Sequence, residues 1–165
     1  MVKKVDDIQT SENSVVARRS PVHGTGVFAI KPIPKGARII EYKGRRVLWS
    51  DHKEKKNGHT ELFHISAKYV LDPSRDGNDA RYINHSCAPN CETMQDGERV
   101  FVFALRNIKP GEELFYDYGL VLGRCFTREE ALLHRCRCGS RNCRGTMLAV
   151  PPSRRAQVLR WAAET

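Results

Sequence analysis

Apolar residues in this chain of 165 residues fall into short runs, and these runs predict strands rather than long helices. The clearest strand is expected at 99–105, where Asp96-Gly97 predicts a tight turn that pairs it with 91–94. Turns rich in glycine and proline separate the other runs. Further strands are expected at 15–18, 27–29, 37–42, 63–65 and 68–71.

Helical patterns are few and short. Thr127 and Glu130 have the spacing of a capping box, which predicts a helix that continues to about Arg135. The same spacing of Asp and Glu predicts a short helix over 50–57. There is no internal repeat, and helices do not alternate with strands, which excludes a doubly wound sheet. The pattern therefore predicts a mainly β fold with few short helices.

The last fifteen residues have a helical pattern of their own. Two prolines and then Ser153 predict a capped start, followed by a helix over 154–163. Val158, Leu159 and Trp161 are expected to face inward from this helix. Such a helix has an apolar side that can pack on its own domain or on a partner.

Composition narrows the class of protein. Apolar residues make up 40% of the chain, and no run approaches the roughly 18 apolar residues that span a bilayer. The first residues lack the apolar core of a signal peptide, and residues 1–14 have the polar composition of a flexible tail. A soluble protein of a reducing intracellular compartment is expected, without membrane contact. There, six cysteines favour metal binding or free thiols over disulfides.

The net charge of +9 is unevenly distributed. Residues 1–123 carry 19 basic and 16 acidic side chains, whereas residues 124–165 carry nine arginines and three glutamates. A basic flank suggests contact with nucleic acid or with an acidic surface. Arginines on a solvated face explain the same composition, so a weak nucleic-acid contact through the C-terminal third stays one of two interpretations.

The densest chemistry lies in residues 81–91, with the sequence Arg-Tyr-Ile-Asn-His-Ser-Cys-Ala-Pro-Asn-Cys. This stretch is expected to begin as a strand and to end in a Pro-Asn turn. Polar side chains beside apolar ones are costly to bury unless each finds a partner, which is typical of a site. The alternative is a surface turn in which His85 caps a neighbour. Cys87 favours a site, because more cysteines follow downstream.

Three of those cysteines lie within eight residues, at 136, 138 and 143. Structural zinc takes four ligands in a tetrahedron, commonly all thiolate, so a fourth ligand is needed. A disulfide would use only two of the three thiols. The fourth ligand has to be one of the remaining cysteines, Cys87, Cys91 or Cys125.

Four motifs and this cysteine loop together resemble the SET-domain protein lysine methyltransferases. They follow the order of that family and span about residues 15–150. The motifs are His23-Gly24-Thr25-Gly26, Glu41-Tyr42-Lys43-Gly44, Arg81-Tyr82-Ile83-Asn84-His85-Ser86-Cys87 and Gly111-Glu112-Glu113-Leu114-Phe115-Tyr116-Asp117-Tyr118, followed by a post-SET cysteine loop at 136–143. The compact layout is similar to stand-alone members that have no pre-SET segment.

The resemblance implies a SET-domain-like fold of small curved sheets with knot-like threading, in which 81–87 passes beneath the segment of Tyr116 and Tyr118. It divides the chain into a tail at 1–14, a SET domain at 15–119, a linker with a short helix at 120–135, a post-SET zinc loop at 136–150 and a C-terminal helix at 151–165. These boundaries are expectations of the family pattern.

The resemblance also implies S-adenosylmethionine as methyl donor and one zinc ion. The expected donor-binding residues are His23, Gly24, Thr25, Gly26, Tyr42, Arg81, Asn84, His85, Arg137 and Leu148. The expected zinc ligands are Cys87, Cys136, Cys138 and Cys143. Glu41 and Asp117 flank aromatic residues and are expected to anchor backbone or basic side chains rather than to act as an acid–base pair.

Methyl transfer from a sulfonium needs an uncharged, aligned lysine amine and no water. A nearby positive charge and desolvation both lower the pKa of a lysine, so no strong base is required. Tyr118 matches the family's catalytic tyrosine. Tyr116 matches the position where the family carries Phe or Tyr as a gate on product size, which implies mainly mono- or dimethylation.

A histone or histone-like tail is the expected substrate, which makes a nuclear, chromatin-associated protein one expectation and a cytoplasmic one the other. A non-histone target is the alternative with the same chemistry. A non-catalytic SET-like module that binds protein or nucleic acid is the alternative of another class. The intact tyrosine pair and the Asn84-His85 pair favour the enzyme.

Overall fold

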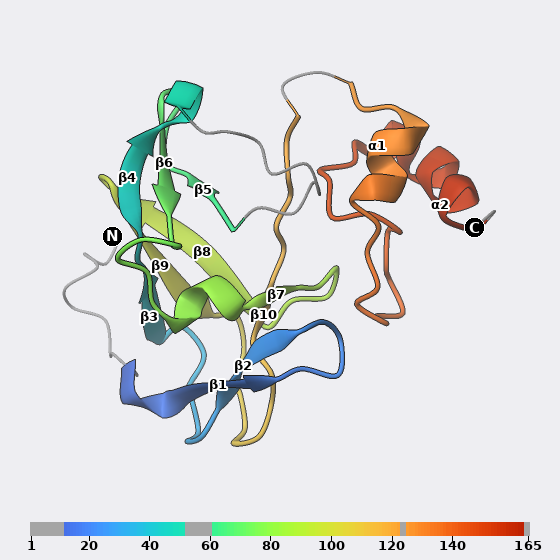
Figure 1. The fold of residues 1–165 in the computed structure, drawn as a ribbon. Coiled ribbons are helices and arrows are strands. Elements are labelled where there is room, and N and C mark those ends of the chain that lie inside the picture. The colour runs from blue at the N-terminus through green and yellow to red at the C-terminus, as the bar shows by residue number, and fades with distance from the viewer. Residues whose placement is uncertain (1–11, 52–60, 123–124, 164–165) are drawn as a thin grey trace, which may run out of the picture.

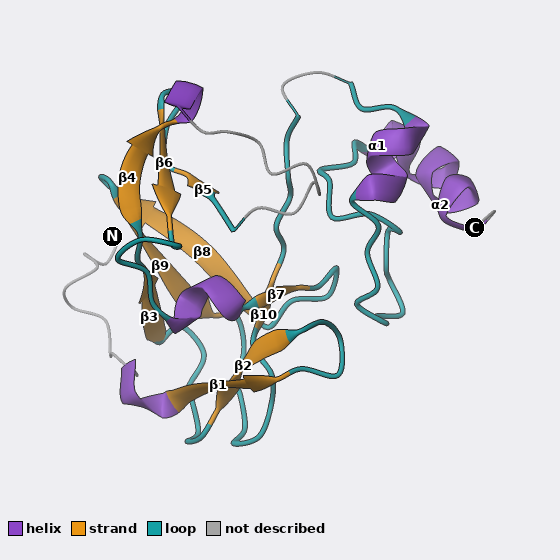
Figure 2. Ribbon diagram, in the orientation of Figure 1, coloured by secondary structure: helices purple, strands orange, loops and turns teal. Residues whose placement is uncertain are grey.

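The computed structural model describes residues 12–51, 61–122 and 125–163. Within them the chain is mainly β, as the sequence predicts, and Figure 2 shows how little of it is helical. The strands are β1 (Val15–Arg19), β2 (Thr25–Ala29), β3 (Arg38–Tyr42), β4 (Arg45–Leu48), β5 (Phe63–His64), β6 (Tyr69–Asp72), β7 (Asn84–His85), β8 (Cys91–Asp96), β9 (Arg99–Ala104) and β10 (Phe115–Tyr116). The helices are η2 (Glu12–Ser14), η3 (Trp49–Asp51), η4 (Asp79–Tyr82), α1 (Arg128–Leu133), η5 (Pro152–Arg154) and α2 (Arg155–Ala163), of which those marked η are 3-10 helices.

The strands form small sheets rather than one large sheet. Three are antiparallel, with the orders β1-β2, β3-β9-β8 and β4-β6-β5. The fourth is a parallel pair of β7 and β10, which lie 30 residues apart in sequence and meet in the middle of the molecule (Figure 1). The predicted hairpin around Asp96-Gly97 is confirmed as β8 and β9, and Gly97 takes a positive φ of 59° in its turn.

One large apolar core, here called the main core, lies among these sheets. Strand β9 supplies its centre: five of its six residues are buried, which explains why the sequence there reads as a continuous apolar run. Val27, Ile39 and Val102 are fully enclosed in the same core. Each such side chain contributes about 1.5–3 kcal/mol of hydrophobic stabilisation, so burial in this core stabilises the packing of the sheets on one another.

A second, smaller core lies in residues 120–163, here called the C-terminal region. It is built by Phe126, Ala131, Leu148 and Val158, with Trp161 packed against them. Helices α1 and α2 lie side by side at one end of the molecule, away from the sheets (Figure 1). The capping box of Thr127 and Glu130 is present with both of its hydrogen bonds, as predicted.

Arginines fasten the end of the chain to this region. The Arg154 guanidinium lies 4.5 Å from the centre of the Phe126 ring and donates to the Phe126 carbonyl at 3.1 Å. Arg135 donates to the Ala162 carbonyl, in the last turn of α2, at 3.1 Å. Part of the positive charge of the C-terminal third is therefore used inside the fold and is not simply a solvated face.

Three local predictions are wrong: the strand at the start of 81–91, the Ser153 cap and the inward position of Leu159. Residues 81 and 82 belong to η4 and not to a strand, because Arg81 N–H bonds the Asn78 carbonyl and the Arg81 guanidinium turns back to the Pro73 carbonyl. Ser153 is not a cap, since the chain enters the final helix through η5 with Pro151 at its start.

Leu159 faces outward with 47% of its surface exposed, whereas Val158 is buried. Successive helical residues are about 100° apart, so Val158 and Trp161 share a side that Leu159 cannot share. The helix predicted over 50–57 falls largely outside the described residues, of which only 50 and 51 lie in η3. Among the residues that the structure describes, no helix is long and apolar enough to cross a membrane.

Candidate active site and metal centre

The parallel pair of β7 and β10 brings the Asn84-His85 segment against the two tyrosines that follow it by about thirty residues. Asn84 is in register with Phe115, and His85 with Tyr116. Ser86 N–H donates to the Tyr116 carbonyl at 3.2 Å, and the Tyr118 hydroxyl donates to the Ile83 carbonyl at 2.8 Å. The hydroxyl of Tyr118 therefore has a fixed position at this crossing of the two segments.

Tyrosine rings gather at this point. The centres of the Tyr116 and Tyr118 rings are 4.9 Å apart, and the Tyr42 ring packs against Phe63 at 5.2 Å. Burial raises the pKa of Tyr118 above its usual range, and the nearby Glu61 carboxylate raises it further. Burial and neighbouring hydroxyls also raise the pKa of Tyr42 and Tyr116. All three phenols are therefore neutral at physiological pH.

His85 connects these tyrosines to the cysteines. Its side chain is only 3% exposed, and Tyr118 N–H donates to its Nδ1 at 3.1 Å. Because Nδ1 accepts, the ring proton lies on Nε2, which is 3.3 Å from Cys87 Sγ. Burial lowers the pKa of His85 to about 4, so the ring is neutral and donates to sulfur.

Asn84 holds the glycine turn of the first motif. Its side-chain N–H groups donate to the carbonyls of His23 and Thr25, each at 3.1 Å, and to Glu113 Oε1 at 3.0 Å. The other oxygen of Glu113 accepts from the Ser20 hydroxyl at 3.0 Å. A buried carboxylate and one amide thus tie three segments of the chain together.

Glycine is required in that turn for two reasons. Gly24 has a φ of +47°, in the left-handed region that other residues rarely adopt. Gly26 is buried, and a Cβ there would lie 2.1 Å from Glu113 Oε1. The side chains of His23 and Thr25 stay exposed on the turn. The fold therefore presents the predicted donor-binding turn at the surface, with its backbone fixed from behind.

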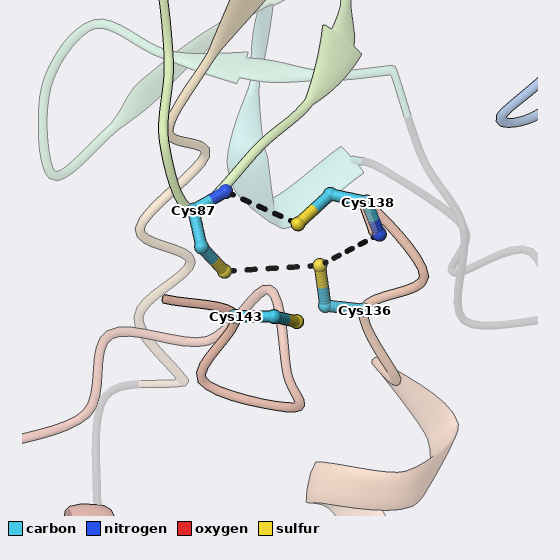
Figure 3. Close-up of side chains that lie close together, drawn as sticks. All are labelled: Cys87, Cys136, Cys138 and Cys143. Carbon is cyan, nitrogen blue, oxygen red and sulfur yellow. Dashed lines mark hydrogen bonds between the residues drawn. The ribbon is translucent and has the colours of Figure 1, made fainter. Parts of the chain in front are cut away.

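Four cysteines form a cluster, Cys87 from the central segment and Cys136, Cys138 and Cys143 from the loop after α1 (Figure 3). Their sulfur atoms all lie within 4.8 Å of one another, and the Cys87 and Cys136 sulfurs are 3.8 Å apart. Tetrahedral zinc at about 2.3 Å from each sulfur separates two sulfurs by roughly 3.8 Å, whereas a disulfide needs about 2.05 Å. No disulfide is present among the described residues, and the spacing of the four sulfurs suits a metal.

Backbone N–H groups surround this cluster. Each sulfur accepts one of them: Cys87 N–H donates to Cys138, Cys138 N–H to Cys136, Arg144 N–H to Cys87 and Gly145 N–H to Cys143, at 3.4–3.5 Å. Such bonds favour thiolate over thiol. Burial raises the pKa of Cys87 and Cys136, and a bound cation would offset that cost. The donor set therefore fits a thiolate-bound metal ion.

The two other cysteines lie elsewhere. Cys91 is fully buried in the main core, where burial raises its pKa to about 12. Cys125 is exposed, outside the cluster. Of the three candidates for a fourth ligand, the structure brings only Cys87 to the loop.

Two further predicted donor-binding residues, Arg81 and Leu148, are also engaged within the protein. The Arg81 guanidinium lies 2.8 Å from Glu61 and 2.9 Å from the Pro73 carbonyl. Leu148 is completely buried in the second core. Arg137, by contrast, is exposed on the cysteine loop.

Glu41 and Asp117 were expected to anchor backbone or basic side chains, and both pair with arginines. Glu41 forms a two-point ion pair with Arg99, and Asp117 forms one with Arg144. Burial acts to raise the pKa of Asp117, but the Arg144 guanidinium outweighs it and the net pKa is lowered. Sequence reasoning missed the Arg144 partner, and also Glu61 and Glu113. In the sequence these residues are marked only by lying in or near a motif. Their burial and their partners depend on the tertiary fold and cannot be predicted from neighbouring residues.

The protein is mainly β and consists of small sheets. At its centre the parallel pair of β7 and β10 lies beside the cysteine cluster and carries Tyr116, with Tyr118 two residues further on. The chain belongs to the SET-domain family, whose model matches residues 24–119, and its cysteine cluster fits a post-SET zinc loop. This confirms the resemblance seen in the sequence.

Three similar proteins illustrate the family. The chain is 34% identical over 153 residues to "Histone-lysine N-methyltransferase set-2" of Caenorhabditis elegans, over 86% of this chain and 10% of that protein. It is 34% identical over 155 residues to "Histone-lysine N-methyltransferase, H3 lysine-4 specific" of Candida albicans, over 87% and 14%. It is 38% identical over 149 residues to "Histone-lysine N-methyltransferase trr" of Drosophila melanogaster, over 84% and 6%. The matched part of these relatives is thus a small fraction of their length.

Proposed function

We propose that this chain is a protein-lysine N-methyltransferase that uses S-adenosylmethionine. The observation that carries the proposal is the half-buried Tyr118, whose hydroxyl donates to the Ile83 carbonyl beside Tyr116. Since that bond uses the hydroxyl proton, the oxygen lone pairs remain available to an amine or a methyl group. The names of the relatives support the same reaction.

The chemistry asked of the protein is modest. The donor, when bound, supplies a methyl group on a positively charged sulfur. The buried rings of Tyr42 and Tyr116 and the half-buried ring of Tyr118 exclude water and disfavour the charged form of an incoming lysine by desolvation. The raised pKa of each tyrosine keeps it neutral, so none acts as a base. Tyr118 aligns the amine, and Tyr116 limits the room for added methyl groups, which favours mono- or dimethylation.

Donor binding is assigned to the turn at 23–26, to Asn84 and His85, and to Arg137 on the cysteine loop. Support comes from the exposed His23 and Thr25 and from the way that Asn84 fixes this turn. Tyr42, Arg81 and Leu148 complete the walls of the pocket. The last two do so by holding their segments in place, because each is engaged within the protein.

The metal is zinc, held by Cys87, Cys136, Cys138 and Cys143. Four sulfurs within 4.8 Å and one N–H donor for each support a structural thiolate site. We assign residues 15–119 to the SET domain, 136–150 to the zinc loop and 151–165 to the C-terminal helix. The linker at 120–135, with its short helix α1, and the C-terminal helix support that loop through the second core.

A histone tail is the favoured substrate, and the relative named for H3 lysine 4 makes that lysine the first to test. A chromatin location follows from such a substrate. A non-histone protein that presents a lysine to the same site is the second candidate. Weak nucleic-acid contact through the basic C-terminal third is supported by the exposed Arg137 and Arg141.

The test is transfer of labelled methyl from S-adenosylmethionine to core histones, to histone H3 with lysine 4 replaced, and to a whole-cell protein extract. Wild type and Tyr118→Phe are run side by side, with donor binding measured separately. Labelling of H3 that disappears with lysine 4 or with Tyr118→Phe is expected, while donor binding stays. Tyr116→Phe is expected to shift the products toward higher methylation.

Unchanged turnover in Tyr118→Phe would overturn the assignment of that residue. Label in the extract but not in histones would move the substrate to a non-histone protein. No donor binding by the wild type would favour a non-catalytic binding module.

A further inference from the structure

The cysteine loop contacts the tyrosine segment through one side chain, Arg144. Its Nη1 donates to Asp117 Oδ2 at 2.6 Å, its Nη2 donates to Asp117 Oδ1, and its Nε donates to the Leu148 carbonyl at 3.1 Å. Only 16% of the Arg144 side chain is exposed. A guanidinium that makes a two-point contact in this setting fixes the orientation of its partner as well as its charge.

The backbone of Arg144 belongs to the cysteine cluster. Arg144 directly follows Cys143, and its N–H donates to Cys87 Sγ at 3.4 Å. The next residue, Gly145, donates to Cys143 Sγ. A metal ion that holds these two sulfurs therefore also fixes the point from which the Arg144 side chain reaches out.

The partner of Arg144 lies between the two tyrosines. Asp117 follows Tyr116 and precedes Tyr118, and one of its oxygens also accepts from Gly119 N–H at 3.0 Å. A second connection runs from the same sulfur, because His85 bridges Cys87 Sγ and Tyr118 N–H. Two chains of contacts thus leave the cysteine cluster and meet at Tyr118.

We propose that Arg144 is a positioning residue that couples metal binding at the cysteine cluster to the orientation of Tyr118. The consequence for turnover rests on the proposed function; the coupling itself does not. Metal binding would order Arg144, and Arg144 would hold the backbone of Asp117, and with it Tyr118, through the ion pair. Asn90 and Asn84 hold the main-core side of the same crossing. The Arg144 contact with Asp117 comes from the loop.

The experiment uses the full chain loaded with zinc and compares Arg144→Gln, Asp117→Asn and the double variant. Arg141→Gln is the matched control, because Arg141 lies on the same loop and is exposed. Three properties are measured: zinc content, the rate of hydrogen exchange at the Tyr118 amide, and turnover. Arg144→Lys serves as the conservative variant, since lysine keeps the charge without the planar fork.

Arg144→Gln is expected to keep one zinc per chain, because the four cysteines and the Arg144 N–H remain. Its Tyr118 amide should exchange at least about tenfold faster, and turnover should fall in parallel. Asp117→Asn should show the same increase in exchange and the same loss of turnover. The double variant should show changes no larger than those of either single variant. Arg144→Lys should recover part of the protection. Removing zinc from the wild type with a chelator should accelerate the same amide.

Equal exchange at Tyr118 in Arg144→Gln and Arg141→Gln would overturn the coupling. So would additive effects in the double variant. Loss of zinc from Arg144→Gln would show that the residue only helps the loop to fold, and would also overturn it. Exchange and zinc content do not require methyl transfer. A wild type that transfers no methyl but shows the expected exchange would refute the proposed function and leave this inference standing.

Discussion

The main core and the C-terminal region are held together by different forces. Strand β9 buries five of its six residues, and the main core encloses many large side chains completely. Among the described residues of 120–163, only the large side chains of Leu148 and Val158 are enclosed to that degree. Chains of about forty residues rarely fold on apolar burial alone and usually need a metal, a disulfide or a partner. The cysteine cluster supplies such a link, and the arginine contacts add to it.

From this difference we predict that loss of the metal unfolds the C-terminal region and leaves the main core folded. Cys138→Ser should lose zinc and remove amide protection from α1 and α2, while the β8–β9 hairpin keeps its protection. Structural zinc contributes an apparent free energy of about 10–16 kcal/mol in small zinc-binding peptides, so this is the largest effect expected here. Hydrogen exchange with mass spectrometry measures it.

Cys125→Ser is the control for that variant, because Cys125 lies outside the cluster. Full zinc content in Cys138→Ser, or protected helices without zinc, would contradict the division.

Truncating one buried side chain in each region sharpens the comparison. Ile39→Ala in the main core should lower the free energy of unfolding of the whole chain by about 2–5 kcal/mol. Leu148→Ala should cost a similar amount but only in the C-terminal region. Denaturant unfolding followed by exchange at single amides tells the two apart. If Leu148→Ala also unfolded the β8–β9 hairpin, the regions would form one cooperative unit.

The glycine turn tests how tightly the main core holds the proposed donor site. Gly26→Ala would place a methyl group on Glu113, and should cost about 1–3 kcal/mol and weaken donor binding. Gly97→Ala is the control: it adds the strain of a positive φ, which Gly26 does not have, but nothing lies near its Cβ, so it should leave donor binding unchanged. Thermal unfolding and titration with the donor measure both. Equal donor affinity in the two variants would show that the contact with Glu113 does not shape the site.

The smallest effect concerns acid stability of the main core. Arg99 lowers the pKa of Glu41 below its ordinary value of 4.5. A carboxyl whose pKa is lower in the folded state stabilises the fold above its unfolded-state pKa, and that stabilisation is lost as pH falls through the folded-state pKa. Glu41→Gln should therefore reduce stability at neutral pH and flatten its decline below about pH 4.5. Unfolding midpoints from pH 7 to pH 3 measure this, and a decline as steep as that of the wild type would refute it.

Local chemistry made much of the fold predictable. Asp96-Gly97 specified its hairpin, and the Thr127 capping box specified α1, because each depends on neighbours within a few residues. The β7–β10 pair could not be predicted from propensity, since each strand has two residues and the partners are far apart in sequence. Leu159 was misplaced because its neighbours Val158 and Trp161 define a narrower apolar side than composition suggested.

The candidate site also has residues that the local sequence predicts and residues that it does not. Spacing indicated three cysteines of the metal centre, but it left the fourth among Cys87, Cys91 and Cys125 until the family resemblance pointed to Cys87. The sequence predicted that Asp117 anchors backbone or a basic side chain, but it did not identify Arg144 as the partner. Glu113 gave no local sign of its role, because its burial depends on the Ser20 and Asn84 side chains that meet it in the folded chain.

The position of Cys87 has a topological consequence. Three sulfurs of the cluster come from one short loop, but Cys87 lies 49 residues before Cys136. A metal that binds all four acts as a cross-link that closes a large ring, and so restricts the unfolded chain. For a ring of roughly fifty residues, the chain-entropy estimate used for disulfides gives about 4 kcal/mol. Since ring closure depends only logarithmically on length, the segment between Cys87 and Cys136 can gain residues at small entropic cost.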